Sequence, residues 1–538
     1  MEEMKVEYRY KPNRDVISSI LKHQNPESLF GKEVTVCGWV QTARDLKETT
    51  FVAVSDGSCA GAIQVVLHEE NEASKGSFAT FKAGATTGAS VKVTGKLVKS
   101  PAEGQAIELV ASEATILGGV DNPAKYPLAK KKHPLETLRM HCHLRPRTKT
   151  IGAVMRLRNA CAFATHSFFN ERGFLYIHTP IITSSDCEGA GEAFHVSTVL
   201  KGGRKSKMPD LQQKKEREEE EKKKQKKSKK EKKKEKKEEK KEEQVSAPED
   251  PKIAEELRDQ IDFSQDFFGK EAYLTVSGQL NVEPFACSMS SVYTFGPTFR
   301  AENSNTTRHL AEFWMIEPEI AFAQLEDDMN LAEDYLKYCV KFCFDRCYDD
   351  LKSLDEFVSK GLIDRLKNIL ASPFARISYT DAVKLLEEHI SEKKVEFDKD
   401  KPVYWGVDFA SEHEKYLCEK VYAKPTVVFN YPKDIKAFYM KQNDDGKTVQ
   451  AMDILCPGIG EVIGGSVRED SHDKLVSRMK ELNMSVEELE WYLDIRKYGS
   501  VPHAGFGLGF ERLLLLVTGL TNIRDVIPYP RFPGHAPY

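Results

Sequence analysis

The sequence predicts an α+β chain, in which a small five-stranded β-barrel precedes a larger domain with a mostly antiparallel sheet flanked by helices. Two observations predict this. Five short segments rich in β-branched residues lie within residues 31–118, bounded by Gly, Asp and Ser. From Arg145 to the end the pattern is mixed α and β. With 538 residues, the chain is long enough for two or three domains.

The five barrel segments fall into about 80 residues, and the oligonucleotide-binding fold is the commonest barrel of that size. We therefore expect a short helical extension over residues 1–30, a barrel over 31–118 and a Pro/Lys-rich hinge over 119–145. A second domain should follow over 146–538, with a charged insertion at about 203–250. Within that domain, residues 353–392 are expected to be helical.

A Lys/Glu tract at 214–243 interrupts the second domain. It holds 17 Lys and Arg against 11 Glu, so the rest of the chain is more acidic than the total of -4. Because the tract has no apolar face, it cannot pack as a core element. We expect either a solvated helix with i,i+4 Glu–Lys pairs or a disordered segment. The functional alternative is that the tract binds the RNA backbone weakly and in a salt-sensitive manner.

Composition favours a cytoplasmic protein. Eleven cysteines, an odd number without paired spacing, suit reduced thiols better than a disulfide framework. The N-terminus lacks an apolar signal core, and no apolar run reaches about 18 residues. Cys339, Cys343 and Cys347 share a helical face, and we expect them in the core rather than around zinc.

The stretch 299–313 holds the densest group of polar and aromatic side chains. Arg300, Glu302, Arg308, His309 and Phe313 lie between two apolar, strand-like segments. A hairpin of this kind places positively charged side chains and an aromatic ring around one small volume. Since arginine matches phosphate oxygens and an aromatic face stacks on a base, the pattern predicts a site for a nucleotide polyphosphate.

Two further segments carry candidate chemistry. Residues 505–512 indicate a Gly-rich strand that enters a buried helix with Arg512 near its start, which can form an anion site. Asp453 and Glu461 flank a Pro/Gly turn, and two such carboxylates can share Mg²⁺. Taken singly, the glycines of residues 505–512 could serve only close packing, and Asp453 and Glu461 could be exposed acids on an ordinary hairpin.

Together these segments resemble the three signature motifs of the class II aminoacyl-tRNA synthetases, in the aspartate/asparagine/lysine subgroup. Residues 173–180 resemble motif 1, a dimer-interface element that ends in proline. Residues 299–313 resemble motif 2 and residues 505–512 motif 3. The N-terminal barrel is similar to the anticodon-binding domain of this subgroup. The resemblance covers residues 31–538 apart from the charged insertion, and it implies a homodimer.

The resemblance implies a role for each motif residue. Arg300 would hold the α-phosphate of ATP, and Arg300, Glu302 and Arg512 would be the catalytic residues. Asp453 and Glu461 would carry Mg²⁺. In the barrel, Phe51 and Gln64 resemble residues that bind the central anticodon base, although core packing is the alternative for Phe51. The residues implied for ATP binding are Arg300, Glu302, Arg308, His309, Phe313, Glu461 and Arg512.

The resemblance also suggests the amino-acid substrate. Glu188 and Gln279 match residues that bind the amino acid in this family. Val282 stands where the aspartate enzymes have a lysine, whereas Glu283 matches the asparagine enzymes, in which it accepts from the side-chain amide; Arg468 would donate to the amide oxygen. A bare aspartate carboxylate about 4 Å from Glu283 would cost on the order of 4 kcal/mol at an effective dielectric near 20.

The expected function is therefore ATP-dependent attachment of asparagine to tRNA(Asn) through an asparaginyl-adenylate, with Mg²⁺ as cofactor. Use of aspartate, or of both amino acids, is the first alternative. An RNA-binding relative without activity is another, which the intact motif residues argue against. A tRNA-independent asparagine synthetase built on the same core is the last, and the barrel argues against it.

Overall fold

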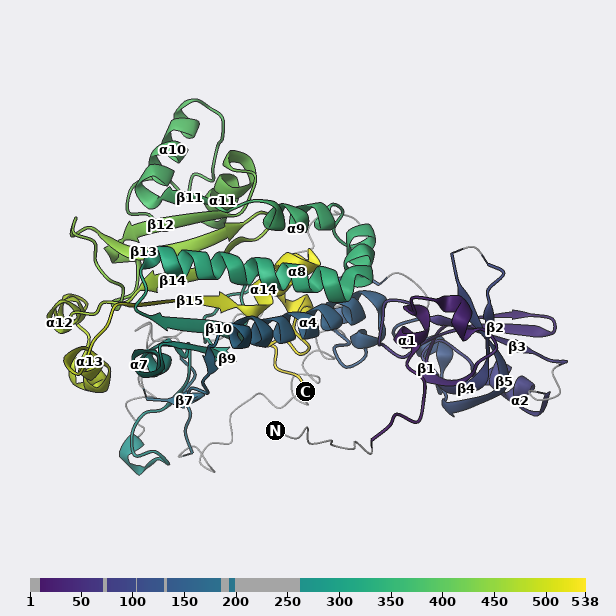
Figure 1. Ribbon diagram of the computed structural model, residues 1–538. Coiled ribbons are helices and arrows are strands. Elements are labelled where there is room, and N and C mark those ends of the chain that lie inside the picture. The colour runs from purple at the N-terminus through teal and green to yellow at the C-terminus, as the bar shows by residue number, and fades with distance from the viewer. Residues whose placement is uncertain (1–9, 71–74, 103, 130–132, 185–192, 199–261) are drawn as a thin grey trace, which may run out of the picture.

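Five strands close into a barrel, drawn in purple and blue in Figure 1, with the order β1-β2-β3-β5-β4. Burial alternates along β2, where Val52 and Val54 are fully buried and their neighbours face outward. The predicted five-stranded barrel is confirmed. Its strands are β1 (Glu33–Leu46), β2 (Thr49–Ser55), β3 (Ile63–His68), β4 (Ser90–Lys99) and β5 (Ile107–Gly118), with helix α2 at Lys75–Gly84.

The computed structural model describes residues 10–70, 75–102, 104–129, 133–184, 193–198 and 262–538. The charged tract at 214–243 and Glu188 lie outside these ranges. In the described part of the N-terminal extension, a short helix, α1 (Ile17–Leu21), and the 3₁₀ turn Pro26–Leu29 replace the expected helical segment. Ile17 and Ile20 are buried in the barrel core, so these residues complete the barrel.

The second domain is built on an eight-stranded sheet with the order β11-β12-β13-β14-β15-β10-β9-β6. Only the outer pairs β11/β12 and β6/β9 are parallel, so the prediction of a mostly antiparallel sheet is confirmed. The strands are β6 (Leu175–Tyr176), β9 (Ser291–Phe299), β10 (Glu312–Ala321), β11 (Ala375–Ser378), β12 (Thr426–Pro432), β13 (Thr448–Cys456), β14 (Gly460–Val467) and β15 (His503–Gly509). A separate small sheet pairs β7 (Ile182–Thr183) with β8 (Tyr273–Leu274).

Long helices cover one face of this sheet (Figure 1). They are α4 (Lys149–Glu171), α8 (Leu325–Phe357) and α14 (Phe510–Thr518), and their apolar sides form the main core with the sheet. The other helices are α3 (Leu135–Arg139), α7 (Gln279–Met289), α9 (Leu362–Ala371), α10 (Tyr379–Ser391), α11 (Ser411–Tyr416), α12 (His472–Glu481) and α13 (Glu490–Lys497). On the other face, β12 and β13 pack against α10 and residues 411–421 in a second apolar cluster, and α7 packs on β9 and β10.

The segment 353–392, expected to be helical, is interrupted by a strand. It contains the end of α8, then α9, the four-residue strand β11 and α10. Ala375–Ser378 pairs in parallel with the edge strand β12, and this tertiary pairing outweighs local propensity. A four-residue strand is too short to show a period in the sequence.

The end of the linker is anchored to the C-terminal segment of the chain. Arg145 is buried, and its guanidinium donates to the carbonyls of Arg524, Ile527 and Pro528. Arg139 donates to both carboxylate oxygens of Asp525, at 2.9 and 2.6 Å. These contacts fix the position at which the linker enters the second domain.

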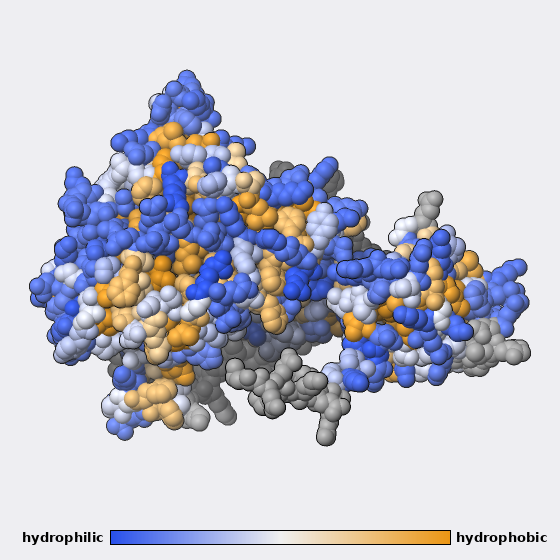
Figure 2. Space-filling view, viewed as in Figure 1, coloured by the Kyte–Doolittle hydropathy of each residue, from blue (hydrophilic) through white to orange (hydrophobic). Residues whose placement is uncertain are grey.

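Cys339 and Cys343 are fully buried and Cys347 is 7 % exposed, which confirms the predicted core cysteines. They lie on α8, and the Cys343 sulfur is 3.4 Å from that of Cys161 on α4. Hydrophilic residues cover much of the visible surface, while hydrophobic residues gather in patches near the middle of the second domain (Figure 2). None of the described helices combines the length and apolar character that a membrane span requires.

Candidate active site

Three neighbouring strands, β10, β14 and β15, turn alternate residues toward the face of the sheet that lacks the long helices. On β10, Ile316 packs into the helix-covered core, so Met315 and Glu319 must face the opposite side. Gly509 lies opposite Met315, and Gly505 lies opposite Glu319. On this face, therefore, glycines leave the backbone of the sheet uncovered by side chains. We call this uncovered surface the glycine strip; it comprises Gly464, Gly505, Gly507 and Gly509.

At one end of the glycine strip lies a cavity of about 200 Å³. The motif 2 hairpin (β9, β10 and their connecting loop), the start of β14 and the first turn of α14 contribute its walls. All the residues that the sequence assigned to ATP line this single cavity: Arg300, Glu302, Arg308, His309, Phe313, Glu461 and Arg512. The structure thus brings together side chains that lie more than 200 positions apart in the sequence.

Within the cavity, the motif 2 hairpin presents the aromatic ring of Phe313, the guanidinium of Arg300 and a pair formed by His309 and Glu302. The Arg300 guanidinium lies 5.5 Å from the centre of the Phe313 ring, a cation–π contact. Nδ1 of His309 lies 2.6 Å from the hydroxyl oxygen of Thr306, and Nε2 of His309 lies 3.9 Å from a carboxylate oxygen of Glu302. The arrangement offers a stacking surface beside a cation, as binding of a purine nucleotide requires.

Arg512 lies in the first turn of α14, where free backbone N–H groups add to its positive charge. Its Nη1 is 3.0 Å from a carboxylate oxygen of Glu461. Burial acts to raise the pKa of Glu461, but Arg512 and Lys436 outweigh it, so this pKa lies below its usual range. Glu461 is therefore ionised at neutral pH and able to bind a cation.

The predicted metal ligands Asp453 and Glu461 converge on one point of the glycine strip. A Cβ added at Gly464 would lie 3.3 Å from Asp453 Oδ1 and 3.5 Å from Glu461 Oε1. Glycine leaves that space open between two hard oxygen donors, which suits Mg²⁺. Lys436 lies 2.7 Å from Asp453, so it balances the charge of this pair. The described residues therefore fit the ion.

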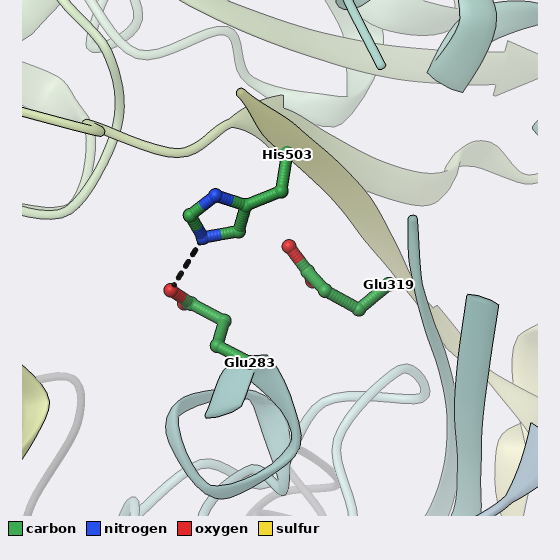
Figure 3. A group of neighbouring side chains, drawn as sticks. All are labelled: Glu283, Glu319 and His503. Atoms are coloured by element: carbon green, nitrogen blue, oxygen red, sulfur yellow. Dashed lines mark hydrogen bonds and ion pairs between the residues drawn. The ribbon is translucent and has the colours of Figure 1, made fainter. Parts of the chain in front are cut away.

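At the other end of the glycine strip lies a buried group of charged side chains, three of which Figure 3 shows: Glu283, Glu319 and His503. Glu283, on α7, is fully buried. Its carboxylate accepts from Gln279, Tyr492, Arg496 and His503, at 2.8 to 3.0 Å. A carboxylate has about four acceptor positions, so these donors occupy all of them.

His503 carries a positive charge in this arrangement. Its Nε2 lies 3.0 Å from Glu283 and its Nδ1 lies 2.8 Å from the carbonyl oxygen of Val501. Since both partners only accept, both ring nitrogens must donate. Burial acts to lower the pKa of His503, but the hydrogen bond and charge of Glu283 outweigh it and raise this pKa.

Arg468 follows β14 and forms a bidentate ion pair with Glu319. Its Nε donates to Oε1 at 3.0 Å and its Nη2 donates to Oε2 at 2.9 Å. Its Nη1 donates to Ser466 at 2.8 Å. A guanidinium has five N–H donors, so two remain available to a ligand. Burial raises the pKa of Glu319, and Arg468 offsets part of this effect.

The structure corrects one step of the sequence argument. The predicted repulsion between Glu283 and an aspartate substrate treated Glu283 as a bare charge. Arg496 and His503 already pair with it, and they hold its pKa well below the usual range although burial acts in the opposite direction. The penalty for aspartate at this position is therefore smaller than two bare charges would produce.

Sequence reasoning missed Glu317, Glu319, Arg496 and His503. Glu317 is buried on β10 and accepts from Ser277, from the N–H of Gly278 at 3.0 Å and from Thr294 at 3.0 Å. One signal was available: two acidic residues alternate within an otherwise apolar strand, which places them on one face. Arg496 had no such signal, because its partner Glu283 lies 213 positions away.

In the barrel, Phe51 and Gln64 lie on the outer face. Both side chains are half-buried. Val52, which lies between the outward-facing Phe51 and Ala53 on β2, is fully buried. The register pairs Ala53 with Gln64 and Phe51 with Val66, so the two predicted residues are diagonal neighbours on one face. This placement argues against the core-packing alternative for Phe51.

The pH dependence of stability tests the charge on His503. Because its pKa is raised on folding, its contribution is complete below the unfolded value of about 6.5 and is lost as pH rises through the folded value. As pH rises from about 6.5, the wild-type free energy of unfolding should fall more than that of His503→Gln. Denaturant titrations measure both, and parallel pH profiles would contradict the assignment.

Comparison with known proteins assigns the chain to a family. Residues 135–216 and 253–533 match the family model for class II tRNA synthetases (D, K and N), and residues 34–117 match the OB-fold nucleic acid binding domain. The asparagine–tRNA ligase of Pasteurella multocida is 51% identical over 521 residues, which cover 97% of this chain and 99% of that protein. The Synechocystis enzyme of the same name is 50% identical, with 98% and 100% covered.

Among solved structures, asparaginyl-tRNA synthetase from Pyrococcus horikoshii, complexed with asparaginyl-adenylate, is similar throughout. Its TM-score is 0.75 at 28% identity, and the match covers 97% of this chain and 99% of that one. The described arrangement of barrel, sheet and motif residues agrees with this likeness. The chain belongs to the asparagine–tRNA ligase family, within the class II tRNA synthetases.

Proposed function

We propose that this enzyme activates asparagine with ATP to form asparaginyl-adenylate and then transfers the asparaginyl group to tRNA(Asn). The observation that carries the proposal is the glycine strip with its two different ends. One end has an open cavity lined by every residue assigned to ATP, and the other has a buried polar group around Arg468. A substrate lying on the glycines would reach both.

The first step is attack of the asparagine carboxylate on the α-phosphorus of ATP. A carboxylate is already ionised at neutral pH, so no general base is required, and positioning together with charge stabilisation supplies the catalysis. Arg300 would hold the α-phosphate and Arg308 and Arg512 the outer phosphates. When bound by Asp453 and Glu461, Mg²⁺ would neutralise charge on the phosphate oxygens.

Spare hydrogen-bonding capacity suggests how asparagine is held. Glu317 accepts three hydrogen bonds in the structure, so about one acceptor position remains for the α-ammonium group. Among the described residues, two N–H donors of Arg468 have no partner and can bind the amide oxygen, and Glu319 has acceptor positions left for the amide NH₂. Glu283 could accept from the amide only if one of its four donors moved. The predicted roles of Glu188 and Gln279 in binding the amino acid stay predictions.

Use of aspartate remains the second candidate function, because the acids of this pocket are neutralised. Glu283 pairs with Arg496 and His503, and Glu319 pairs with Arg468. An aspartate carboxylate would nevertheless accept from Arg468 while leaving Glu319 without an amide donor. A site built for hydrogen bonds rejects an analogue that leaves its buried groups unpaired.

Parallel measurements with three amino acids test this substrate assignment. ATP–pyrophosphate exchange should be at least about a hundredfold more efficient with asparagine than with aspartate, since a mismatch in a buried polar site costs several kcal/mol. Lysine serves as the control for the third member of the subgroup. Comparable exchange with asparagine and aspartate would refute selection by the Arg468–Glu319 pair.

Substitution of Arg300 tests the ATP site. Arg300→Ala removes a cation from the position proposed for the α-phosphate, and exchange with asparagine should fall by a factor of about 10² to 10³ while the fold is retained. Arg376→Ala is the matched control, since that arginine contacts Asn330 and Glu326 at the surface. Near-normal exchange in Arg300→Ala would exclude the proposed role.

Binding of tRNA would involve both domains. The outer face of the barrel, with Phe51 and Gln64, is proposed for the anticodon, where stacking contributes about 1–3 kcal/mol per base. These roles stay predictions from the resemblance, as does a cytoplasmic location.

A homodimer is proposed from the motif 1 region, where apolar residues are exposed. Leu175 is 48 %, Tyr176 41 %, Ile181 46 % and Ile182 42 % exposed. Contiguous exposed apolar residues indicate an interface. Sedimentation equilibrium should give twice the chain mass of 60.9 kDa, and Leu175→Asp with Ile181→Asp should shift the mass toward the monomer. A monomer at all protein concentrations would contradict the proposal.

A further inference from the structure

The turn between β13 and β14, taken together with the first residue of β14 as residues 457–460, lies between two cavities. Glu461 and Val462, directly after the turn, line the ATP cavity. Pro457, Gly458 and Ile459 line a second cavity of about 500 Å³ on its other side. Ile459 packs against the main core, whereas Pro457 and Gly458 have this cavity beside them. Hydrogen bonds therefore add to what packing supplies in fixing the position of the turn.

Two carboxylates from one segment supply such bonds to the backbone of the turn. Glu414 Oε2 accepts from the N–H of Glu461 at 3.1 Å. Glu419 Oε1 accepts from the N–H of Gly458 at 2.8 Å. Burial and the neighbouring charge of Glu461 raise the pKa of Glu414 to about 7, so its carboxyl group is only partly ionised at neutral pH, and a neutral carboxyl oxygen still accepts the N–H. Both ends of the turn are thus held by side chains of the segment 411–421, which we call the bracket segment.

A local irregularity lets both carboxylates reach the turn. Residues five apart on an α-helix are about 140° apart around its axis and point in different directions. The chain changes from α11 to a π-helical turn at Leu417–Val421, closed by a bond from the N–H of Tyr422 to the carbonyl of Leu417. The wider i→i+5 turn brings Glu419 back toward the side of Glu414. π-Helical turns of this kind are often found at functional sites.

The bracket segment also contacts the phosphate-binding side of the cavity. The guanidinium of Arg308 donates from Nη1 to the hydroxyl of Ser411. A Cβ added at Gly460 would lie 2.4 Å from Glu414 Oε2 and 3.5 Å from Nη1 of Arg308. Glu414, the turn and Arg308 therefore meet at a position that only glycine fits.

We propose that Glu414 and Glu419 are positioning residues that hold the 457–460 turn, and with it Glu461, in the geometry that binds Mg²⁺–ATP. Neither side chain contacts substrate in this role. Glu414 fixes the backbone of Glu461, whose carboxylate pairs with Arg512 at 3.0 Å. The inference rests on the proposed function, because it assigns the bracket segment to the nucleotide site of that reaction.

Steady-state ATP–pyrophosphate exchange, with Mg²⁺ and ATP varied separately, tests the proposal on the full-length enzyme, and calorimetric titration of Mg²⁺ in the presence of a non-hydrolysable ATP analogue measures the affinity without turnover. Glu414→Ala and Glu419→Ala should each raise the Mg²⁺ concentration for half-maximal rate by about tenfold, since the loss of an acceptor that leaves a backbone N–H unpaired costs about 1.4 kcal/mol. The KM for asparagine should change less than about twofold, because that pocket lies at the other end of the glycine strip.

Matched variants separate positioning from general stability. Glu414→Gln and Glu419→Gln keep an oxygen that can accept the same N–H, so they should restore most of the Mg²⁺ affinity. Glu412→Ala is the control on the same helix, since Glu412 contacts Asp398 and Lys401 outside the site. It should leave the Mg²⁺ dependence unchanged.

Three results would be decisive. A wild-type enzyme without asparagine-dependent exchange would refute the proposed function itself. Normal exchange in the wild type, with an unchanged Mg²⁺ dependence in Glu414→Ala and Glu419→Ala, would overturn the positioning role alone. If Glu414→Ala does not fold, Glu419→Ala decides, because Glu419 is partly exposed and its only bond to the turn is the one to Gly458 among those described.

Discussion

The alternation of side chains along β10, β14 and β15 is the constraint on which the rest of the site depends. Successive residues of a strand point to opposite faces, so a strand that buries Ile316 against the helices must turn Met315 and Glu317 the other way. Because the three strands are hydrogen-bonded neighbours, their outward residues form one continuous surface. Glycine on β14 and β15 leaves room on that surface for a substrate.

Charge distribution differs between the two ends of this surface. At the nucleotide end, Arg512 pairs with Glu461 beside an open cavity, and incoming phosphates can compete for the cation. At the amino-acid end, the side chains of Glu283 and Arg496 are fully buried, and removal of Glu283 would leave the charges of Arg496 and His503 uncompensated in a medium of low dielectric. At the nucleotide end, Arg512 can therefore exchange Glu461 for a phosphate. At the amino-acid end, the buried ion pairs stay in one arrangement, and the site can discriminate between ligands.

The sequence predicted local features better than contacts. The motif 2 hairpin and the strand-to-helix turn before Arg512 depend on nearby residues, and the structure has both. The expected helix over 353–392 was interrupted, because pairing of Ala375–Ser378 with β12 is a tertiary effect. The partners of Glu283 could not be predicted for the same reason: Arg496 and His503 come from separate elements, and only folding brings them together.

The bracket segment shows how far this dependence on remote contacts extends. Neither Glu414 nor Glu419 belongs to a signature motif, and they lie 47 and 39 positions from the residues that they contact. The motif residues supply charges, but a carboxylate binds a cation well only when its backbone is held in place. Because a cavity lies beside the 457–460 turn, packing through Ile459 supplies only part of that support. Residues outside the motifs supply the rest, and the two glutamates are placed to do so.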